Sequence, residues 1–465
     1  MRKLKNILAM ILVFATAASV LSCAESAGTW TSAGQTENKD HGVTVSGSGT
    51  NETSGAFDAV IREDAVSNEN GDAETDAGSS SINEDSGNDG MTYPDTELET
   101  SESAVNFALK LLAATAESKE GESVVISPYS VLSALAMTAN GAVGDTLSEM
   151  ETAIGMRLSD LNEYLPAYAS SLPSSEGAKL TDANSVWIRD DGALHVDQAF
   201  IGNIADLYRA DTFTGAFSAG DINEWISDNT DGRIANMLDE MPGDDVMFLV
   251  NAVLFDALWD EAYYENEIRR GTFTNAEGKD ETVELMYKDG FNGGFALDGA
   301  VGFVRHYAGN TYDFVAILPD EGTTPGEYLK ALDVGTFLTG LHDLCPVRTC
   351  MPKFAIDTEI DMKPVLAAFG MRTPFDPNKA DFSGIGKYRD DNLYISKVIH
   401  RAMIKADGLG TEAGAATVVA MAPGAAGPGT DSEIMTVYLT RPFIFMVTDT
   451  ATHTPIFCGI VNSVA

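Results

Sequence analysis

The sequence predicts an α+β domain that follows an N-terminal stretch of different composition. Helical periodicity is concentrated early in the domain, where Val105, Ala108, Leu111 and Leu112 recur on one helical face. Continuous apolar runs of strand length come mainly later, as in Phe248–Phe255. Helices that largely precede strands favour a segregated α+β arrangement over alternating βαβ units.

Length and charge restrict the classes of function. The chain has 465 residues, of which 44% are apolar, so it can bury a large core. Its formal net charge is −41, from 70 acidic and 29 basic residues. Nucleic acids and anionic membrane surfaces require basic patches, and a field of this sign repels both. Protein partners remain compatible with it.

The N-terminus has the pattern of a secretory signal peptide. Three basic residues stand among the first five, and the apolar run Ile7–Leu21 follows. The run ends in Ala-Ser-Val-Leu-Ser-Cys, which resembles a bacterial lipobox with Cys23 as the lipidated residue. We therefore expect residues 1–22 to be a lipoprotein-type signal peptide. A lipid on Cys23 would anchor the secreted protein at the outer face of the cell membrane. The alternative is an ordinary signal peptide cut near Ala24.

Residues 23–95 have the composition of a disordered tether. Between Ala24 and Asp95 there are 15 acidic residues against Lys39 and Arg62, and apolar residues follow no period. Such a segment buries too little surface to offset its chain entropy, and its like charges repel one another. The sequence thus predicts a spacer of about 70 residues that carries a folded domain over residues 96–465.

Within that domain, period and turn residues predict the individual elements. Helices are expected at Glu102–Ser118, after Ser127-Pro128 as far as Asn140-Gly141, and at Ser148–Ile154, Gln198–Leu207 and Asp221–Asn229. Strands are expected at Val124–Ile126, Phe248–Phe255, Asp313–Leu318, Val437–Leu439, Phe443–Val447 and Pro455–Val461.

The motifs of common enzyme and metal sites are absent. The chain contains no G-x-S-x-G, H-E-x-x-H, Walker or G-x-G-x-x-G motif, and its six histidines show no i, i+3 or i+4 pairing. We expect no catalytic residue, no metal and no cofactor. Four cysteines are too few for a disulfide scaffold. Cys345 and Cys350 leave a local disulfide open, whereas Cys458 lies in an apolar run typical of a buried thiol.

One long segment inside the domain departs from local rules. Gly410–Val419 consists of small residues apart from Glu412, and Ala420–Thr430 is rich in Ala, Gly and Pro. Loops of this length are usually functional or disordered. Thr411, Ala413, Ala415 and Thr417 alternate on one face at period two, and all are small. That pattern suits a segment that slides between two paired strands, although a flexible linker would also look like this.

The same segment resembles the hinge of the reactive-centre loop in serpins, the serine protease inhibitors. Further blocks resemble the family in the right order over Glu99–Ala465: Asn106–Ala108, Ile126–Ser130, Ala139–Ala142, Ile222–Ile226, Thr230–Ile234, Leu249–Ala252 leading to Trp259, Leu318–Asp320, Pro352–Phe354, Asp381–Ile385, Ile399–Ala402 and Arg441–Phe445. Each block is a weak signal by itself, but their number and order make the resemblance specific.

The resemblance implies a metastable serpin-like fold with three β-sheets, about nine helices and an exposed reactive-centre loop at about 408–435. It implies an irreversible suicide-substrate inhibitor that acts as a monomer and has no catalytic residue of its own. A protease cleaves the loop, and the hinge then inserts into the main sheet and traps the acyl-enzyme. The hinge residues would be Gly410, Thr411, Glu412, Ala413, Gly414, Ala415, Ala416 and Thr417.

Two further sets of residues carry over from the family. Ser127, Ser130, Asn223 and His400 match the shutter, a buried hydrogen-bond cluster under the strands that must part. Family loops are cut about 17 residues from the start of the hinge region, counted here from Gly408, which gives Gly424–Ala425 as the reactive bond. Its small residues indicate an elastase-like serine protease with a shallow pocket as partner.

Three features depart from the family pattern, of which one is Thr440 in place of the usual Asn or Asp before Arg-Pro-Phe. Gly408 stands where the family usually has Glu, so the usual ion pair with the position of Lys353 is absent. Counting back from Arg441-Pro442-Phe443 gives a loop about seven residues longer than usual. The alternative position for the cut is therefore near Ala426 or further along the chain. The competing functions are a non-inhibitory serpin-like binding lipoprotein, a surface adhesin and, least favoured, a hydrolase.

Overall fold

A computed structural model describes residues 8–18, 95–172, 177–189, 192, 194–234, 237–241, 245–388, 392–411 and 434–464. The predicted tether lies outside these ranges except for Asp95, which begins the first helix. The folded domain therefore starts one residue before the boundary that the sequence predicts, and its first helix starts seven residues before the expected Glu102.

The described ranges contain the nine α-helices and three sheets that the serpin resemblance implies. The helices are α1 (Asp95–Ser118), α2 (Pro128–Ala139), α3 (Gly144–Ile154), α4 (Leu158–Ser171), α5 (Gln198–Tyr208), α6 (Ala219–Asn229), α7 (Pro325–Ala331), α8 (Val334–His342) and α9 (Lys363–Ala368), with short 3-10 turns η1 (Glu265–Glu267) and η2 (Thr373–Phe375). None of these described helices combines the length and the apolar character needed to cross a membrane.

The first sheet, here called the main sheet, has seven strands. Its order is β12 (Phe354–Asp361), β14 (Leu393–Ala406), β1 (Leu8–Ala18) with β15 (Gly410–Thr411), β6 (Asp245–Leu258), β3 (Ala178–Arg189) and β5 (Asp211–Gly215). β6 and β14 do not pair with each other along their length, because β1 and β15 lie between them. The space between β6 and β14 is called the central gap below.

A second sheet of nine strands and a small third sheet complete the domain. The second sheet runs β16 (Met435–Tyr438), β11 (Cys345–Pro352), β8 (Asp280–Leu297), β9 (Ala300–His306), β10 (Tyr312–Pro319), β17 (Phe443–Asp449), β18 (Pro455–Val461) and β2 (Val124–Ile126), with β7 (Ile268–Thr274) on β8. The third pairs β13 (Gly386–Tyr388) with β4 (Leu194–Val196).

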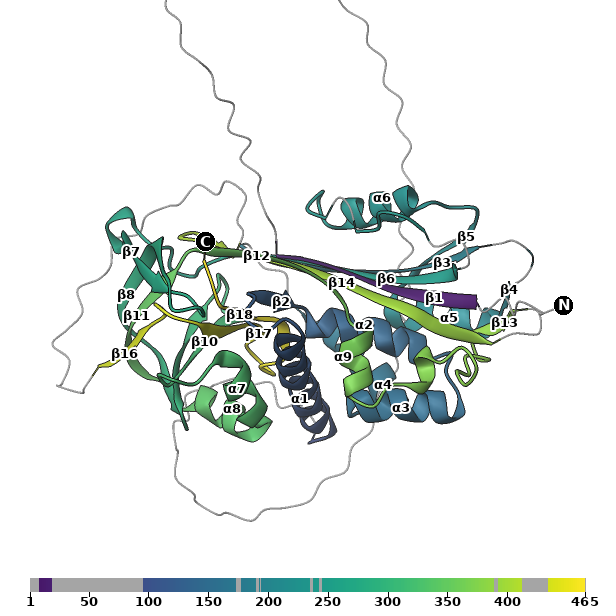
Figure 1. Ribbon diagram of the computed structural model, residues 1–465, viewed down its shortest axis with the longest axis horizontal. Helices are drawn as coiled ribbons and strands as arrows, with labels where there is room; N and C mark the ends of the chain where they lie inside the picture. The colour runs from purple at the N-terminus through teal and green to yellow at the C-terminus, as the bar shows by residue number, and fades with distance from the viewer. Residues whose placement is uncertain are drawn as a thin grey trace, which may run out of the picture. The chain divides into compact units, whose positions relative to one another are not determined.

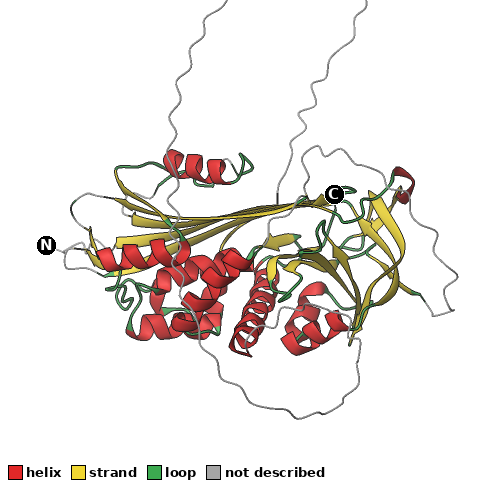
Figure 2. Ribbon diagram, turned by 180° about the vertical axis from the view of Figure 1, so that it is seen from behind, coloured by secondary structure: helices red, strands yellow, loops and turns green. Residues whose placement is uncertain are grey.

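Helices cover the two faces of the main sheet unequally. α6 lies alone on one face, whereas α2 and its neighbouring helices lie on the other (Figures 1 and 2). Under α6, Trp225 and Ile226 pack with Phe248 of β6 in a separate apolar cluster. α2 is buried along its whole length, because it runs beneath the main sheet and against the second sheet. Helices thus cover both faces of the main sheet at its central strands.

Candidate functional site: the hinge and the central gap

The hinge begins inside the main sheet. β15 pairs antiparallel with both neighbours, since Thr411 lies opposite Ala406 of β14 and opposite Ala257 of β6. A tight turn connects it to β14, in which the Asp407 N–H donates to the Gly410 carbonyl over 3.0 Å. Thr411 is fully buried. The first two of the eight predicted hinge residues therefore already occupy strand positions in the central gap.

Gly410 is required by the close approach of β6. A Cβ atom at this position would lie 2.1 Å from the Ala257 carbonyl oxygen and 2.7 Å from the Leu258 Cα. Both neighbours are backbone atoms and cannot rotate away, so any larger residue would push β15 out of the sheet. The sequence shows this glycine only as a small residue, and the structure supplies the steric reason for it.

Aromatic residues form the wall beside the hinge. The Trp259 ring stacks on the Tyr307 ring with centroids 4.6 Å apart. The Trp259 indole N–H donates to the Asp407 carbonyl over 2.8 Å, and its backbone N–H donates to the Leu409 carbonyl over 2.8 Å. Trp259 thereby fixes the turn that leads into β15. Of these two rings, the sequence singled out only Trp259, as part of a family block.

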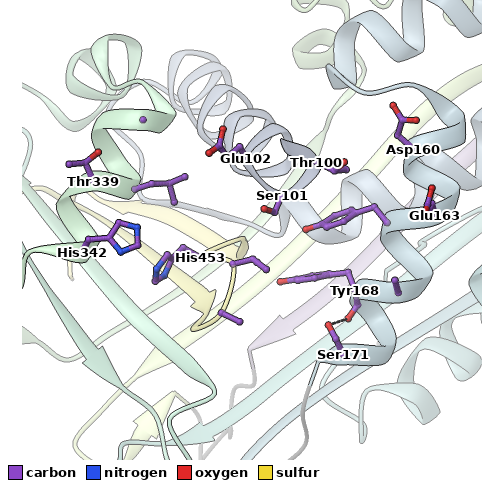
Figure 3. A pocket seen from close by; sticks show the side chains of 16 residues that line it. Thr100, Ser101, Glu102, Asp160, Glu163, Tyr168, Ser171, Thr339, His342 and His453 are labelled. Atoms are coloured by element: carbon purple, nitrogen blue, oxygen red, sulfur yellow. Dashed lines mark hydrogen bonds between the residues drawn. The ribbon is translucent and has the colours of Figure 1, made fainter. Parts of the chain in front are cut away.

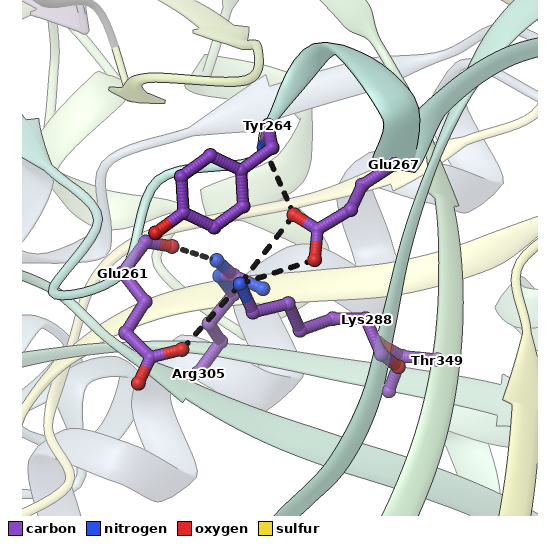
Figure 4. Close-up of polar contacts among 6 residues, drawn as sticks. All are labelled: Glu261, Tyr264, Glu267, Lys288, Arg305 and Thr349. Carbon is purple, nitrogen blue, oxygen red and sulfur yellow. Dashed lines mark hydrogen bonds and ion pairs between the residues drawn. The ribbon is translucent and has the colours of Figure 1, made fainter. Parts of the chain in front are cut away.

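A charged cluster braces the loop after Trp259. The Arg305 guanidinium is buried against the Tyr263 ring, 4.0 Å from its centroid, and donates to the Glu261 carbonyl. Lys288 pairs with the Glu261 and Glu267 carboxylates over 3.4 and 3.5 Å, as Figure 4 shows. This loop matters to the hinge because the Tyr263 N–H donates to the Gly408 carbonyl over 2.8 Å.

Below β15, the N-terminal strand β1 fills the central gap. It runs parallel to both neighbours, from Leu8 opposite Leu393 to Ala18 opposite Phe255, and Figure 1 shows it between β6 and β14. The sequence predicts a signal peptide for these residues. Removal of this segment stays a prediction. In the full chain, β1 occupies the strand position between β6 and β14 that an inserting hinge would need.

A buried polar cluster joins both sides of the gap from beneath. The Ser127 N–H donates to the His400 Nε2 on β14 over 3.1 Å, and the Ser130 N–H donates to the Ser127 hydroxyl over 3.2 Å. The Ser130 hydroxyl donates to the Asn251 side-chain carbonyl on β6. The Asn251 amide then donates to Asp182 and Asn184 of β3, each over 2.8 Å. α2 is thereby hydrogen-bonded to strands on both sides of the gap.

The electrostatics of this cluster follow from its burial. Desolvation lowers the pKa of His400 to about 3, so the ring is neutral and Nε2 can accept the hydrogen bond from the Ser127 backbone N–H. Desolvation also raises the pKa of Asp182, although its hydrogen bonds oppose this effect. The cluster therefore depends on His400 remaining neutral.

One predicted member of the cluster is wrong. Asn223 lies on α6, on the opposite face of the sheet, where its side chain accepts from the Met237 and Leu238 N–H groups and donates to the Leu238 carbonyl. It holds the segment after α6 and contacts neither Ser130 nor His400. Asn251 occupies the position that the sequence assigned to Asn223. Its signal was a single amide inside the apolar run Phe248–Phe255.

Other predicted site residues lie outside the described ranges. These are Glu412, Ala413, Gly414, Ala415, Ala416 and Thr417 of the hinge, the bond Gly424–Ala425, and Cys23. The sequence predicts that Lys353 lacks its usual ion-pair partner in the hinge. In the structure, Lys353 pairs with Glu284 over 2.9 Å. Gly408 faces Ile268, whose Cδ1 would lie 2.9 Å from a Cβ atom there.

The three cysteines of the described ranges are free thiols. Cys345 and Cys350 lie on the same strand, β11, opposite Gly294 and Tyr287, so the local disulfide that the sequence left open is not formed. Burial raises the pKa of Cys350 to about 11. Cys458 is buried in β18, as its apolar neighbours predicted.

A cavity of about 650 Å³ lies away from the hinge, between α1, α4, α8 and the turn that joins β17 to β18. His342 and His453 line one side and Tyr168 the other, with Ser101 between them (Figure 3). The two imidazole rings have centroids 5.9 Å apart. Among the described residues, no three His, Cys, Asp or Glu side chains are grouped to hold a metal ion.

Comparisons with known proteins agree on one family. Residues 102–464 match the family model described as Serpin (serine protease inhibitor). An uncharacterized serpin-like protein of Thermococcus kodakarensis is 30% identical over 72% of this chain and 79% of its own. The native-state structure of the thermophilic serpin tengpin is 39% identical over 80% of this chain and 95% of its own, with a TM-score of 0.73. Human thyroxine-binding globulin, complexed with thyroxine, shares the fold at 21% identity, with a TM-score of 0.69 over 80% of this chain and 100% of its own.

Proposed function

Because the chain belongs to the serpin family, whose members are generally protease inhibitors, we propose that it is an irreversible suicide-substrate inhibitor of serine proteases. The observation that carries the proposal is β15. Gly410 and Thr411 already pair with both β14 and β6, so the start of the hinge is in the register that further insertion would extend. A loop that served only as a linker would not need its first residues paired between β14 and β6.

The hinge sequence supports insertion beyond Thr411. At period two, the side chains that share the face of Thr411 are Ala413, Ala415 and Thr417, all small. Thr411 itself is fully buried, so the residues that follow it on this face require the same small size. About 17 inserted residues would span roughly 55 Å.

The chemistry needs no catalytic group from this chain. The protease serine attacks the carbonyl carbon of the reactive bond, which becomes an acyl ester as the C-terminal part of the loop leaves with a proton on its new amine. The freed hinge then inserts and pulls the esterified protease with it. Distortion of the protease oxyanion hole leaves the ester unhydrolysed.

We place the reactive bond at Gly424–Ala425 and the target among elastase-like proteases. The residues around this bond are small, and no Lys or Arg lies between Lys405 and Arg441 to suit a trypsin-like pocket. Because the loop is longer than usual, the alternative reactive bond lies near Ala426 or further along the chain.

Insertion also requires that β1 leave the central gap. We propose that residues 1–22 are removed during secretion and that a lipid on Cys23 then anchors the protein outside the cell through its acidic tether. Removal of this segment would free the strand position between β6 and β14. In this scheme the processed chain, residues 23–465, is the active inhibitor.

The test is to incubate the processed chain with pancreatic elastase and to resolve the mixture on a denaturing gel. The proposal predicts a stable high-mass band that contains both proteins. Sequencing the released C-terminal fragment should place its first residue at Ala425. Cleavage of the loop without any stable complex would contradict the inhibitory function.

The rival function is a non-inhibitory binding protein of the same fold. The cavity between α1, α4 and α8 is where such a protein could hold a small ligand. The small hinge residues and the inserted β15 favour inhibition, since a binding protein needs neither. A chain that elastase cleaves without forming a complex, and whose cavity retains a small molecule after purification, would favour the rival.

A further inference from the structure

We infer that Tyr307 is a positioning residue that holds the start of the hinge in the main sheet before any protease arrives. The contact is a single hydrogen bond between the Tyr307 and Thr411 hydroxyls, whose oxygens lie 2.5 Å apart. Both residues are fully buried. This pair is called the hinge latch below.

The Tyr307 side chain is held rigidly from its own side. Its ring stacks on Trp259 and meets the Phe255 ring edge-on, with centroids 5.2 Å apart. Its backbone N–H donates to the Tyr312 carbonyl over 3.0 Å, which closes the turn between β9 and β10. The Ala308 N–H donates to the Leu258 carbonyl over 2.8 Å, and Leu258 is the partner of Gly410. The hydroxyl therefore has a fixed position relative to β6.

Because the Tyr307 hydroxyl is buried, it needs a hydrogen-bond partner within the protein. Desolvation raises the pKa of Tyr307 well above its usual value, so the group stays neutral and can donate or accept. The neighbouring rings of Phe255 and Trp259 carry no atom that could accept a hydrogen bond from this hydroxyl. If Thr411 left the sheet, the hydroxyl would lose its bond in apolar surroundings, which is more costly than losing an exposed bond. The latch therefore favours a hinge that is inserted by two residues.

The latch should act on inhibition in two opposite ways, and this part of the inference rests on the proposed function. It ties down the N-terminal end of the loop, which restricts how far the loop can extend toward a protease. It also supplies the first two pairs of the inserting strand before cleavage, which removes a slow nucleation step from insertion. Loss of the latch should make protease binding faster but trapping less efficient.

The direct test is hydrogen exchange measured by mass spectrometry on the full chain. In Tyr307→Phe, the amides of residues 406–411 should exchange about fivefold to tenfold faster than in the parent, as expected for one lost buried hydrogen bond. Thr411→Val should do the same, and the double variant should exchange no faster than either single variant. Thr411→Ser, which keeps a hydroxyl, should match the parent.

Two controls keep the test decisive. Tyr312→Phe removes a buried tyrosine hydroxyl whose ring also packs on Phe255, and it should leave exchange at the hinge unchanged. If Tyr307→Phe fails to fold, the comparison of Thr411→Val with Thr411→Ser decides alone. Unchanged exchange in Thr411→Val, or additive effects in the double variant, would overturn the latch.

Inhibition assays on the processed chain separate the latch from the function. Tyr307→Phe should associate faster with elastase and should consume at least twice as many inhibitor molecules per protease trapped. If the parent traps no serine protease, the proposed function fails while the exchange result still judges the latch. If the parent traps elastase and exchange in Tyr307→Phe is unchanged, only the latch is wrong.

Discussion

Two strands share the central gap of the main sheet, and they differ in origin and direction. β15 continues the chain from β14, runs antiparallel to both neighbours and is held by a buried side-chain hydrogen bond. β1 comes from the far N-terminus and runs parallel to the same two strands. The backbone edges of β6 and β14 thus accept a strand in either direction. Which strand fills the gap is decided by which segment is available and by the side chains that fix it.

The largest expected effect comes from removing one of the two strands. The processed chain, residues 23–465, should form a stable complex with elastase, whereas the full chain with β1 in the gap should only be cleaved. The physical reason is that a hinge cannot occupy strand positions that are already paired. Both chains should be compared on one denaturing gel with equal elastase. Equal complex formation by the two would show that β1 does not block insertion.

The next effect comes from the hinge strand itself. Thr411→Arg would place a charge where the side chain is fully buried between β6 and β14, which is too costly for the strand to enter. The processed variant should therefore be cleaved as a substrate, with complex formation reduced at least 100-fold. Thr411→Ser is the matched control and should retain the complex. An unimpaired Thr411→Arg would rule out insertion by this register.

The cluster beneath the gap should respond more moderately. Asn251→Ala would leave the Ser130 hydroxyl and Asp182 each without one buried partner, so we expect a loss of about 2–3 kcal/mol in the free energy of unfolding. Asn223→Ala loses bonds only to the segment after α6 and should cost about 1 kcal/mol. Urea unfolding of both variants measures the difference. A larger loss in Asn223→Ala would contradict the assignment of Asn251 to this cluster.

The smallest effect is a dependence on pH. Burial lowers the pKa of His400 to about 3, below the value of about 6.5 in an unfolded chain. Between these values only the unfolded state takes up the proton, so stability is complete above pH 6.5 and falls as the pH drops. The expected loss is about 1.4 kcal/mol per pH unit.

Urea unfolding between pH 7 and pH 5 measures this slope. His306 acts in the opposite sense, because its hydrogen bond to Asp313 raises its pKa, so the parent must be compared with His400→Gln. The slope should be flatter in His400→Gln. The same slope in both proteins would mean that His400 can be protonated within the fold.

The sequence predicted the elements that carry strong periodicity or long apolar runs. α2, α5 and α6, and the cores of β6 and β10, lie where turn residues and spacing placed them. α4 was missed because Pro166, which disfavours a helix interior, lies inside the segment, although the helix forms around it. β14 was missed because Ser396, Lys397, Arg401 and Lys405 interrupt its apolar residues, so no continuous apolar run marks the strand.

The site was predictable where it depends on residue size and not where it depends on contact. Alternating small residues predicted a hinge, and the structure adds that Gly410 and Thr411 are already in the sheet. No pattern links Tyr307 to Thr411, because residues 104 positions apart meet only through the fold. For the same reason the sequence alone does not separate Asn223 from Asn251 as the member of the buried polar cluster. Both are amides near apolar residues, and only tertiary packing separates them.

In the proposed mechanism, cleavage of the loop adds a strand to the central gap. The most direct measurement is the melting temperature of the processed chain before and after a trace of elastase has cut its loop. A newly paired and buried strand should raise the melting temperature by at least about 10 °C. An unchanged or lower melting temperature after complete cleavage would contradict insertion.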